Sequence, residues 1–324
     1  MAGSRRLTGV VLVFVALAAP AYAQEIVFAS LEDARRILAT SDDYSKAMSA
    51  FDRALRMRSA GEPTESEFLA FAANAAMPWS ADEREAVEAA YKEIHGNVAR
   101  LGLPLPPRVH FVRTSGDEDS HAAYTRQDAI MLPTRMLATM RGTALARLVG
   151  HELYHVATRA HPKIVDPLYA AIGFQRCGDV ELPPSLAARR ITNPDAPKDA
   201  HCIRVLVRDE PVWALPVLAA TATKAEILAG GDFLSYVTVV LLLVEWTPGP
   251  GVARALTDST GPRVQTIQEV AGFFDQVGRN TLYLIHPEEI TADNFTLLAL
   301  GWVDVPSPAI LERIRKVLAD YAAR

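Results

Sequence analysis

The sequence predicts an α+β fold that is rich in helices and holds a small, mostly antiparallel sheet ahead of one long helix. Three observations support this class. Helix start signals and apolar periodicity fill residues 30–101, short β-like runs fill 108–133, and an apolar helical pattern covers 143–159. We therefore expect an N-terminal helical region over 24–101 and one domain over 102–324.

The N-terminal region is predicted to be helical because two of its stretches match the capping-box pattern. Thr64 and Ser80 are each followed three residues later by a glutamate, ahead of an apolar-periodic run. The stretch "GLPLPP" at 102–107 then breaks the helical pattern and marks the expected boundary. The helices expected before this break cover 31–39, 43–59, 65–76 and 81–100.

The segment after the break is predicted to form the sheet and the long helix. "RVHFVR" (108–113) is typical of a strand, and "AAYTRQDAIMLP" (122–133) holds two β-like runs around Gln127-Asp128. We expect these strands to pair as a small antiparallel sheet. Helices are then expected over 134–140 and 143–159.

The remaining chain alternates between irregular and regular patterns. Residues 176–200 are rich in proline and charge, which indicates an irregular excursion. Pro287 suits a first helical turn, and Ser307-Pro308 suits the start of another helix. The elements expected here are strands at 203–208 and 212–221, a buried strand or core helix at 236–246, a helix from Pro287 to Gly301 and a last helix ending near residue 322.

The first 23 residues have the layout of an export signal. Arg5 and Arg6 form a charged start, Val10 to Ala19 an apolar run, and Ala21-Tyr22-Ala23 a small-residue cleavage site. The run is shorter than the roughly 20 apolar residues that a membrane-spanning helix needs. We expect a mature chain that begins at Gln24, in the periplasm or the extracellular space, without a stable membrane anchor.

The cysteine count indicates the redox environment of the protein, and the net charge indicates which class of partner is disfavoured. Cys177 and Cys202 are the only cysteines, and an even count in an oxidising compartment predicts one disulfide bond, with two buried thiols as the alternative. The net charge is −5, and no basic stripe with interleaved aromatic residues is present. These features argue against nucleic acid as a partner.

The stretch "VGHELYHVATRAHP" (149–162) contains an HExxH motif. Residues four apart lie on one face of a helix, so His151 and His155 can direct ring nitrogens at one zinc ion. Glu152 then projects beside that ion, where it is placed to act as a general base. The alternative is a pair of core histidines satisfied by ordinary hydrogen bonds, but the apolar residues around the helix predict burial, and a buried histidine pair needs partners.

A catalytic zinc takes three protein ligands, and two candidates compete for the third position. His161 has the spacing of HExxHxxGxxH, the metzincin pattern. That pattern fails here because Thr158 stands at the glycine position and no methionine follows Met140. Glu289 is the other candidate, since it forms an ExxxD pattern with Asp293 on the helix predicted after Pro287.

With these two motifs the chain resembles the gluzincins, the thermolysin-like zinc metallopeptidases. The resemblance implies a zincin-like fold, with His151, His155 and Glu289 as zinc ligands and Glu152 as base and acid. It implies that Asp293 accepts a hydrogen bond from the free ring N–H of the first histidine. It also implies that the edge strand of the preceding sheet, in "HAAYTR" or "AIMLP", binds extended peptide. The long segment 162–280 between the motifs departs from the family pattern, and we expect it to be an insertion beside or over the cleft.

Peptidases of this kind also use a tyrosine or histidine to stabilise the oxyanion. Tyr283 and His286 are the nearest candidates in sequence, and Tyr124 and Tyr236 are further options.

The predicted function is therefore that of an exported zinc metallopeptidase acting on peptides or proteins, in which zinc lowers the pKa of a water toward about 7 and Glu152 takes its proton. The alternative is a non-catalytic exported binding or scaffold protein of zincin ancestry.

Overall fold

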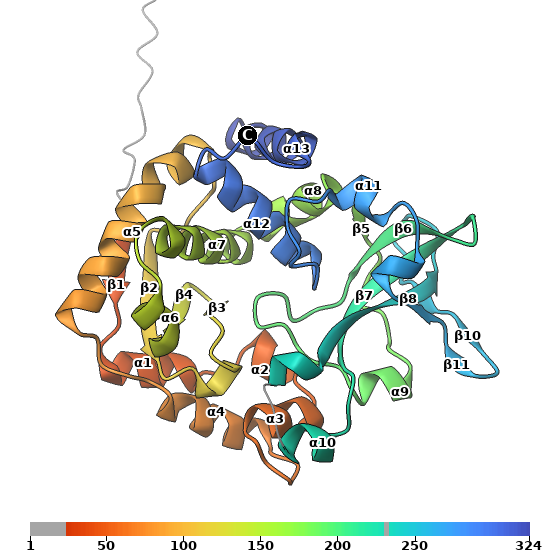
Figure 1. Ribbon diagram of the computed structural model, residues 1–324, viewed down its shortest axis with the longest axis horizontal. Coiled ribbons are helices and arrows are strands. Elements are labelled where there is room, and N and C mark those ends of the chain that lie inside the picture. The colour runs from red at the N-terminus through yellow and green to blue at the C-terminus, as the bar shows by residue number, and fades with distance from the viewer. Residues whose placement is uncertain (1–23, 230–232) are drawn as a thin grey trace, which may run out of the picture.

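Two main sheets, a separate two-stranded sheet and a group of long helices build a mixed α+β molecule (Figure 1). The computed structural model describes residues 24–229 and 233–324, so the predicted export signal lies outside the described residues. No helix among the described residues is long and apolar enough to cross a membrane.

Most N-terminal helices begin and end close to the predicted positions. The capping boxes expected at Thr64 and Ser80 both form. The single helix expected over 43–59 is wrong, because Met48 has an extended backbone and Ser49 caps a separate helix. The helices are α1 (Leu31–Leu38), α2 (Asp43–Ala47), α3 (Ala50–Arg56), α4 (Glu65–Asn74) and α5 (Ala81–Arg100).

The first sheet has the strand order β1-β2-β4-β3 and is mostly parallel, so the expected antiparallel sheet is wrong. The predicted hairpin does form, with Gln127 at its turn in a left-handed conformation. However, β3 lies at the outer edge, which places β4 beside β2 and parallel to it. A further strand that the sequence reading missed, β1, joins the other edge in parallel. The strands are β1 (Glu25–Phe28), β2 (Arg108–Thr114), β3 (Tyr124–Arg126) and β4 (Ala129–Pro133).

Because β1 pairs with β2, the chain before residue 102 is not a separate helical unit. The predicted break at 102–107 is a loop that connects two parts of one fold. The long helix α5 also packs against α7, the helix that carries the HExxH motif. The N-terminal region therefore supports the candidate site directly.

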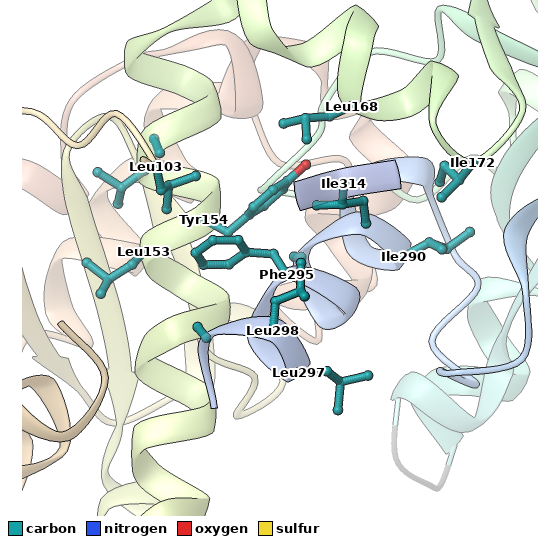
Figure 2. Packing of buried hydrophobic residues seen from close by; sticks show 14 of the residues in the cluster. Leu103, Leu153, Tyr154, Leu168, Ile172, Ile290, Phe295, Leu297, Leu298 and Ile314 are labelled. Carbon is teal, nitrogen blue, oxygen red and sulfur yellow. The ribbon is translucent and has the colours of Figure 1, made fainter. Parts of the chain in front are cut away.

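The central helices pack against each other through a large apolar core. Figure 2 shows Tyr154 of α7 lying beside Phe295 of α12, with their ring centroids 5.6 Å apart. The Tyr154 hydroxyl donates a hydrogen bond to Thr291 of α12 at 2.7 Å. This contact fixes the two helices relative to each other. The helices of this part are α6 (Thr134–Thr139), α7 (Thr143–Ala160), α12 (Pro287–Ala299) and α13 (Pro308–Ala322).

The predicted insertion contains a second sheet whose pairings are all antiparallel. The run at 236–246 is a strand, which decides between the two expected alternatives. The main strands are β5 (Phe174–Arg176), β6 (His201–Val207), β7 (Glu210–Ala220) and β8 (Val237–Glu245), with short strands β9 (Arg254–Ala255) and β12 (Val264–Gln265). Strands β10 (Thr257–Asp258) and β11 (Gly261–Pro262) form a separate two-stranded antiparallel sheet. Its short helices are α8 (Val165–Ala170), α9 (Pro184–Ala187), α10 (Lys224–Ala229) and α11 (Phe273–Val277).

The predicted disulfide bond between Cys177 and Cys202 is confirmed. Both cysteines are fully buried in a small apolar cluster, with Cys202 in β6 and Cys177 directly after β5. The bond closes the irregular segment between them, which returns to the first sheet and to α7 before it enters β6. Such a bond is consistent with an exported protein.

Candidate metal site

Helix α7 presents the two motif histidines on one face, as their spacing predicts. Their rings lie edge to face with centroids 4.7 Å apart. The helix is buried over most of its length because its apolar residues face α5, α12 and the first sheet. His155 is 1% exposed, so its ring nitrogens depend on protein partners.

Helix α12 brings Glu289 to these histidines from far along the chain. The Glu289 Oε2 atom lies 3.0 Å from His151 Nε2 and 3.3 Å from His155 Nε2. One ligand atom from each of the three residues lies within 4.8 Å of the other two. The structure therefore brings together the three residues predicted as ligands, in a geometry that can hold a metal ion.

Two further carboxylates of α12 orient the histidine rings. Asp293 Oδ1 is 3.1 Å from His151 Nδ1, the contact expected from the ExxxD pattern. Glu288 Oε1 is 2.9 Å from His155 Nδ1, a contact that the sequence reading missed. Each histidine thus uses Nδ1 for a carboxylate and turns Nε2 toward Glu289. This is the arrangement in which supporting carboxylates fix the ring of a metal-binding histidine.

Glu288 is itself held by neutral donors. The hydroxyls of Thr158 and Tyr169 donate hydrogen bonds to its two carboxylate oxygens, at 2.5 Å and 2.6 Å. Thr158 is the residue that departs from the metzincin glycine, so its side chain has a role here that glycine lacks. The adjacency of Glu288 to Glu289 in "HPEE" was the only sequence signal for it.

The facing charges shift the pKa values of the three central residues. Burial disfavours the charged form of His151, but its hydrogen bonds to Asp293 and Glu289 outweigh burial and raise its pKa to about 9. Burial opposes the charge on His155 too, yet the surrounding carboxylates raise its pKa well above 6.5. For Glu289, the histidine charges outweigh burial and lower the pKa well below its usual value.

Glu152 lies beside this group with a perturbed pKa. Its side chain is 2% exposed, and one of its oxygens lies within 4.8 Å of a His155 ring nitrogen. Burial and the neighbouring Asp195 carboxylate raise the pKa of Glu152 to about 8. A carboxylate whose pKa lies near neutrality is suited to exchange protons.

Two buried atoms of this site, Glu152 Oε2 and His155 Nε2, make no hydrogen bond in the described structure, although His155 Nε2 lies 3.3 Å from Glu289 Oε2. A buried polar atom without a partner is costly, so each calls for an explanation. His155 Nε2 points toward Glu289, where a shared metal ion would satisfy it. The donor set of two imidazoles and one carboxylate also matches the ligands that zinc takes in catalytic sites. The residues present therefore fit a metal ion.

The segment between the two cysteines contributes residues that the sequence reading missed. The Asn193 side-chain amide donates a hydrogen bond to Glu289 Oε1 at 2.7 Å. Asp195 forms a second cluster with Glu152 and His155, again with one ligand atom from each residue within 4.8 Å of the others. No motif spacing connects these residues to HExxH. The predicted insertion does reach the cleft.

A cavity of about 390 Å³ opens beside the candidate metal site. Its lining combines aliphatic and methionine side chains with the polar groups of the site. The lining residues are Ala122, Ala123, Met136, Met140, Ala144, Arg147, Leu148, His151, Glu152, Asp195, Tyr283, Glu289 and Asp293.

Tyr283 is the candidate oxyanion donor that reaches this cavity. Its ring centroid is 6.3 Å from that of His151. His286 instead caps α12 by accepting a hydrogen bond from the Glu288 amide. Tyr124 donates to Glu118, and Tyr236 packs in a separate apolar cluster. The structure thus separates Tyr283 from the other three.

His161, the alternative third ligand, lies away from the group. It ends α7, and its ring packs toward Tyr321 of α13 with centroids 6.5 Å apart. His161 follows the last residue of α7, ten residues beyond His151. Its side chain therefore leaves the helix face that carries the two motif histidines. Among the described residues it belongs to no cluster that could hold a metal ion.

The edge strand predicted to bind peptide is β3, in "HAAYTR", whereas "AIMLP" forms the interior strand β4. Ala122 and Ala123, just before β3, line the cavity. Farther along, the Thr125 amide donates a hydrogen bond to Asp195 Oδ1 at 2.8 Å. Part of this edge is therefore occupied by the chain itself.

Comparisons of the chain with protein-family models, with curated protein sequences and with solved structures each gave no match.

Proposed function

We propose that this protein is an exported zinc-dependent metallopeptidase of the gluzincin type. One observation carries the proposal: HExxH on α7 faces Glu289 on α12, with ligand atoms of His151, His155 and Glu289 grouped within 4.8 Å. Two residues of a five-residue motif and a glutamate from a distant helix meet at one buried point. Burying these groups together is unfavourable unless they are paired or bind an ion.

Zinc would be held by His151, His155 and Glu289, where it supplies a Lewis acid that polarises a peptide carbonyl and activates a water molecule. Glu288 and Asp293 hold the two imidazoles through their Nδ1 atoms. They keep both Nε2 atoms directed at the ion. Asn193 satisfies the other oxygen of Glu289 and so fixes its orientation.

Glu152 moves the protons in this proposal. Its raised pKa allows it to take a proton from the attacking water and return it to the leaving amine. We assign Tyr283, which lines the same cavity, as the hydrogen-bond donor to a developing oxyanion. Apolar residues that line the cavity, such as Met136 and Leu148, would contact the substrate.

Zinc content per chain tests the metal site. The protein beginning at Gln24 is expected to carry about one zinc per chain, and Glu289→Ala is expected to lose most of it, because a three-ligand site would keep two ligands. His161→Ala serves as the matched control and should retain zinc. Loss of zinc from His161→Ala, with retention by Glu289→Ala, contradicts the ligand set.

Turnover tests the catalytic part. Glu152→Gln keeps the size of the side chain but cannot accept a proton, so it is expected to bind zinc normally and to lose peptide hydrolysis by at least about a hundredfold. Hydrolysis of a mixed peptide library by the parent and not by this variant supports the peptidase. Stoichiometric zinc with no hydrolysis by any variant would favour a non-catalytic binding protein.

A further inference from the structure

The segment Asn193–Asp195 places a carboxylate inside the candidate active site. The Asp195 side chain is 8% exposed and lines the cavity beside Glu152 and Glu289. The segment belongs to the irregular stretch between the two cysteines, and a strongly polar side chain at this depth requires partners.

One oxygen of Asp195 occupies the edge of the first sheet. Its Oδ1 atom accepts hydrogen bonds from the Thr125 amide at 2.8 Å and from the Thr125 hydroxyl at 2.6 Å. Thr125 lies in the middle of β3, and a free edge-strand amide is a donor that an extended peptide uses when it adds to a sheet. Asp195 therefore occupies a position that a peptide carbonyl would take.

The same carboxylate lies beside the candidate metal ligands. An Asp195 oxygen is within 4.8 Å of a Glu152 oxygen and of a His155 ring nitrogen. Aspartate oxygen is a ligand that zinc accepts, and a catalytic zinc site needs one position left open. Asp195 is placed to fill that position.

Several hydrogen bonds hold the segment in this place. Arg159 of α7 donates to the carbonyls of Pro194 and Asp195, each at 3.3 Å. Asn193 donates to Glu289, and Arg190 donates to the Pro197 carbonyl at 2.6 Å. The segment is thus anchored on both sides of Asp195, on α7, on α12 and within its own loop.

We propose that the segment Asn193–Asp195 is a built-in inhibitor, in which Asp195 ligates the active-site metal and blocks the edge strand, so that the peptidase is latent while the segment is in place. This inference rests on the proposed function. It adds that peptide binding requires the segment to leave the cleft.

Two variants of Asp195 separate the two parts of the block. Asp195→Ala removes both the metal ligand and the contact with Thr125. Asp195→Asn keeps an oxygen that can accept a hydrogen bond from the Thr125 amide. The neutral amide group of this variant is, however, a poor zinc ligand. Glu181→Gln is the matched control, because Glu181 lies between the same two cysteines, is exposed and does not line the cavity.

The measurements are zinc content, the visible spectrum of the cobalt-substituted proteins, the affinity for acetohydroxamic acid and hydrolysis of a peptide library. Acetohydroxamic acid binds an accessible zinc ion. We expect both Asp195 variants to keep their metal, to change the cobalt spectrum and to bind acetohydroxamic acid at least about tenfold more tightly, which corresponds to about 1.4 kcal/mol. Hydrolysis should rise most in Asp195→Ala, and Glu181→Gln should match the parent.

Failure of the two proposals can be told apart. Full zinc content in the parent and both Asp195 variants, with unchanged cobalt spectra and acetohydroxamic acid affinity, would overturn the inhibitor and leave the metal site standing. A well-folded parent that binds no zinc would overturn the proposed function and the inhibitor with it. If Asp195→Ala does not fold, the cobalt spectrum of Asp195→Asn and its affinity for acetohydroxamic acid test whether Asp195 ligates the metal.

Discussion

At the scale of single residues, the candidate site depends on how each histidine is held. His151 and His155 each use Nδ1 for a carboxylate of α12, and these carboxylates belong to different turns of that helix. Supporting carboxylates of this kind commonly contribute 10- to 100-fold to metal affinity, so the residues behind the ligands matter nearly as much as the ligands.

Glu288→Gln is expected to weaken zinc binding by roughly 10- to 100-fold, because His155 loses the negative charge at its Nδ1 atom. Competition with a chromophoric chelator measures the affinity. Glu85→Gln, at an exposed position of α5, is the control and should match the parent. Equal affinities in all three proteins would mean that Glu288 has a packing role only.

The pKa values of the histidines predict how metal binding depends on pH. Metal ions bind neutral imidazole, whereas His151 has a pKa of about 9 and that of His155 is also raised. Below these values each imidazole must release its proton when the ion binds. Zinc affinity should therefore rise with pH between 6 and 8, by up to about tenfold per pH unit for each proton displaced. Calorimetry in buffers of different ionisation enthalpy measures this release, and a pH-independent affinity would contradict the prediction.

At the scale of elements, the position of α7 depends on its close contact with α5. Gly150 stands next to His151 on the buried side of α7. A Cβ atom built there would lie 2.3 Å from the Ile94 Cδ1 atom of α5, which is closer than packed atoms allow. The absence of a side chain lets the two helices approach, and this approach sets where the motif histidines lie.

Gly150→Ala is therefore expected to lower the free energy of unfolding by about 1–3 kcal/mol through overpacking, although alanine favours helix formation by about 1 kcal/mol. Adding Ile94→Val removes the clashing methyl group and should restore part of the loss, as a double-mutant cycle in urea would measure. Gly96→Ala is the control, because nothing lies within 4 Å of its added Cβ, and it should stabilise the protein slightly. A Gly150→Ala protein as stable as Gly96→Ala would show that α5 can shift freely.

At the scale of the whole molecule, the disulfide bond links the second sheet to the cleft. It closes a loop that carries Asn193 and Asp195, so the part of the chain that reaches the candidate site is tied at its base to the second sheet. A bond across a loop of about 26 residues restricts the unfolded chain by roughly 3.5 kcal/mol.

Replacing both Cys177 and Cys202 by serine is expected to lower the free energy of unfolding by about that amount. Urea denaturation of the parent, with and without a reducing agent, gives the comparison. The serine variant should not respond to the reducing agent. A parent whose midpoint is the same in both conditions would contradict this role of the bond.

Local patterns in the sequence determined the bounds of most long helices and several residues of the candidate site. Caps and periodicity located α1, α4, α5, α7, α12 and α13 closely, because helix ends depend on hydrogen bonds between near neighbours. The four-residue spacing placed His151 and His155 on one face for the same reason. The cysteine count, together with the predicted export signal, predicted the disulfide bond. ExxxD pointed to Glu289 and Asp293 because both stand on one predicted helix.

The tertiary structure alone decided what depends on contacts between distant segments. Strand pairing is such a contact, so the sequence revealed the hairpin of β3 and β4 but not the parallel pairing of β2 with β4 or the edge position of β1. The choice of Glu289 over His161, and of Tyr283 over His286, depends on which side chains the packed helices bring to one cavity. Asp195 had no sequence signal at all, because a loop residue joins a site through the fold around it and not through any spacing along the chain.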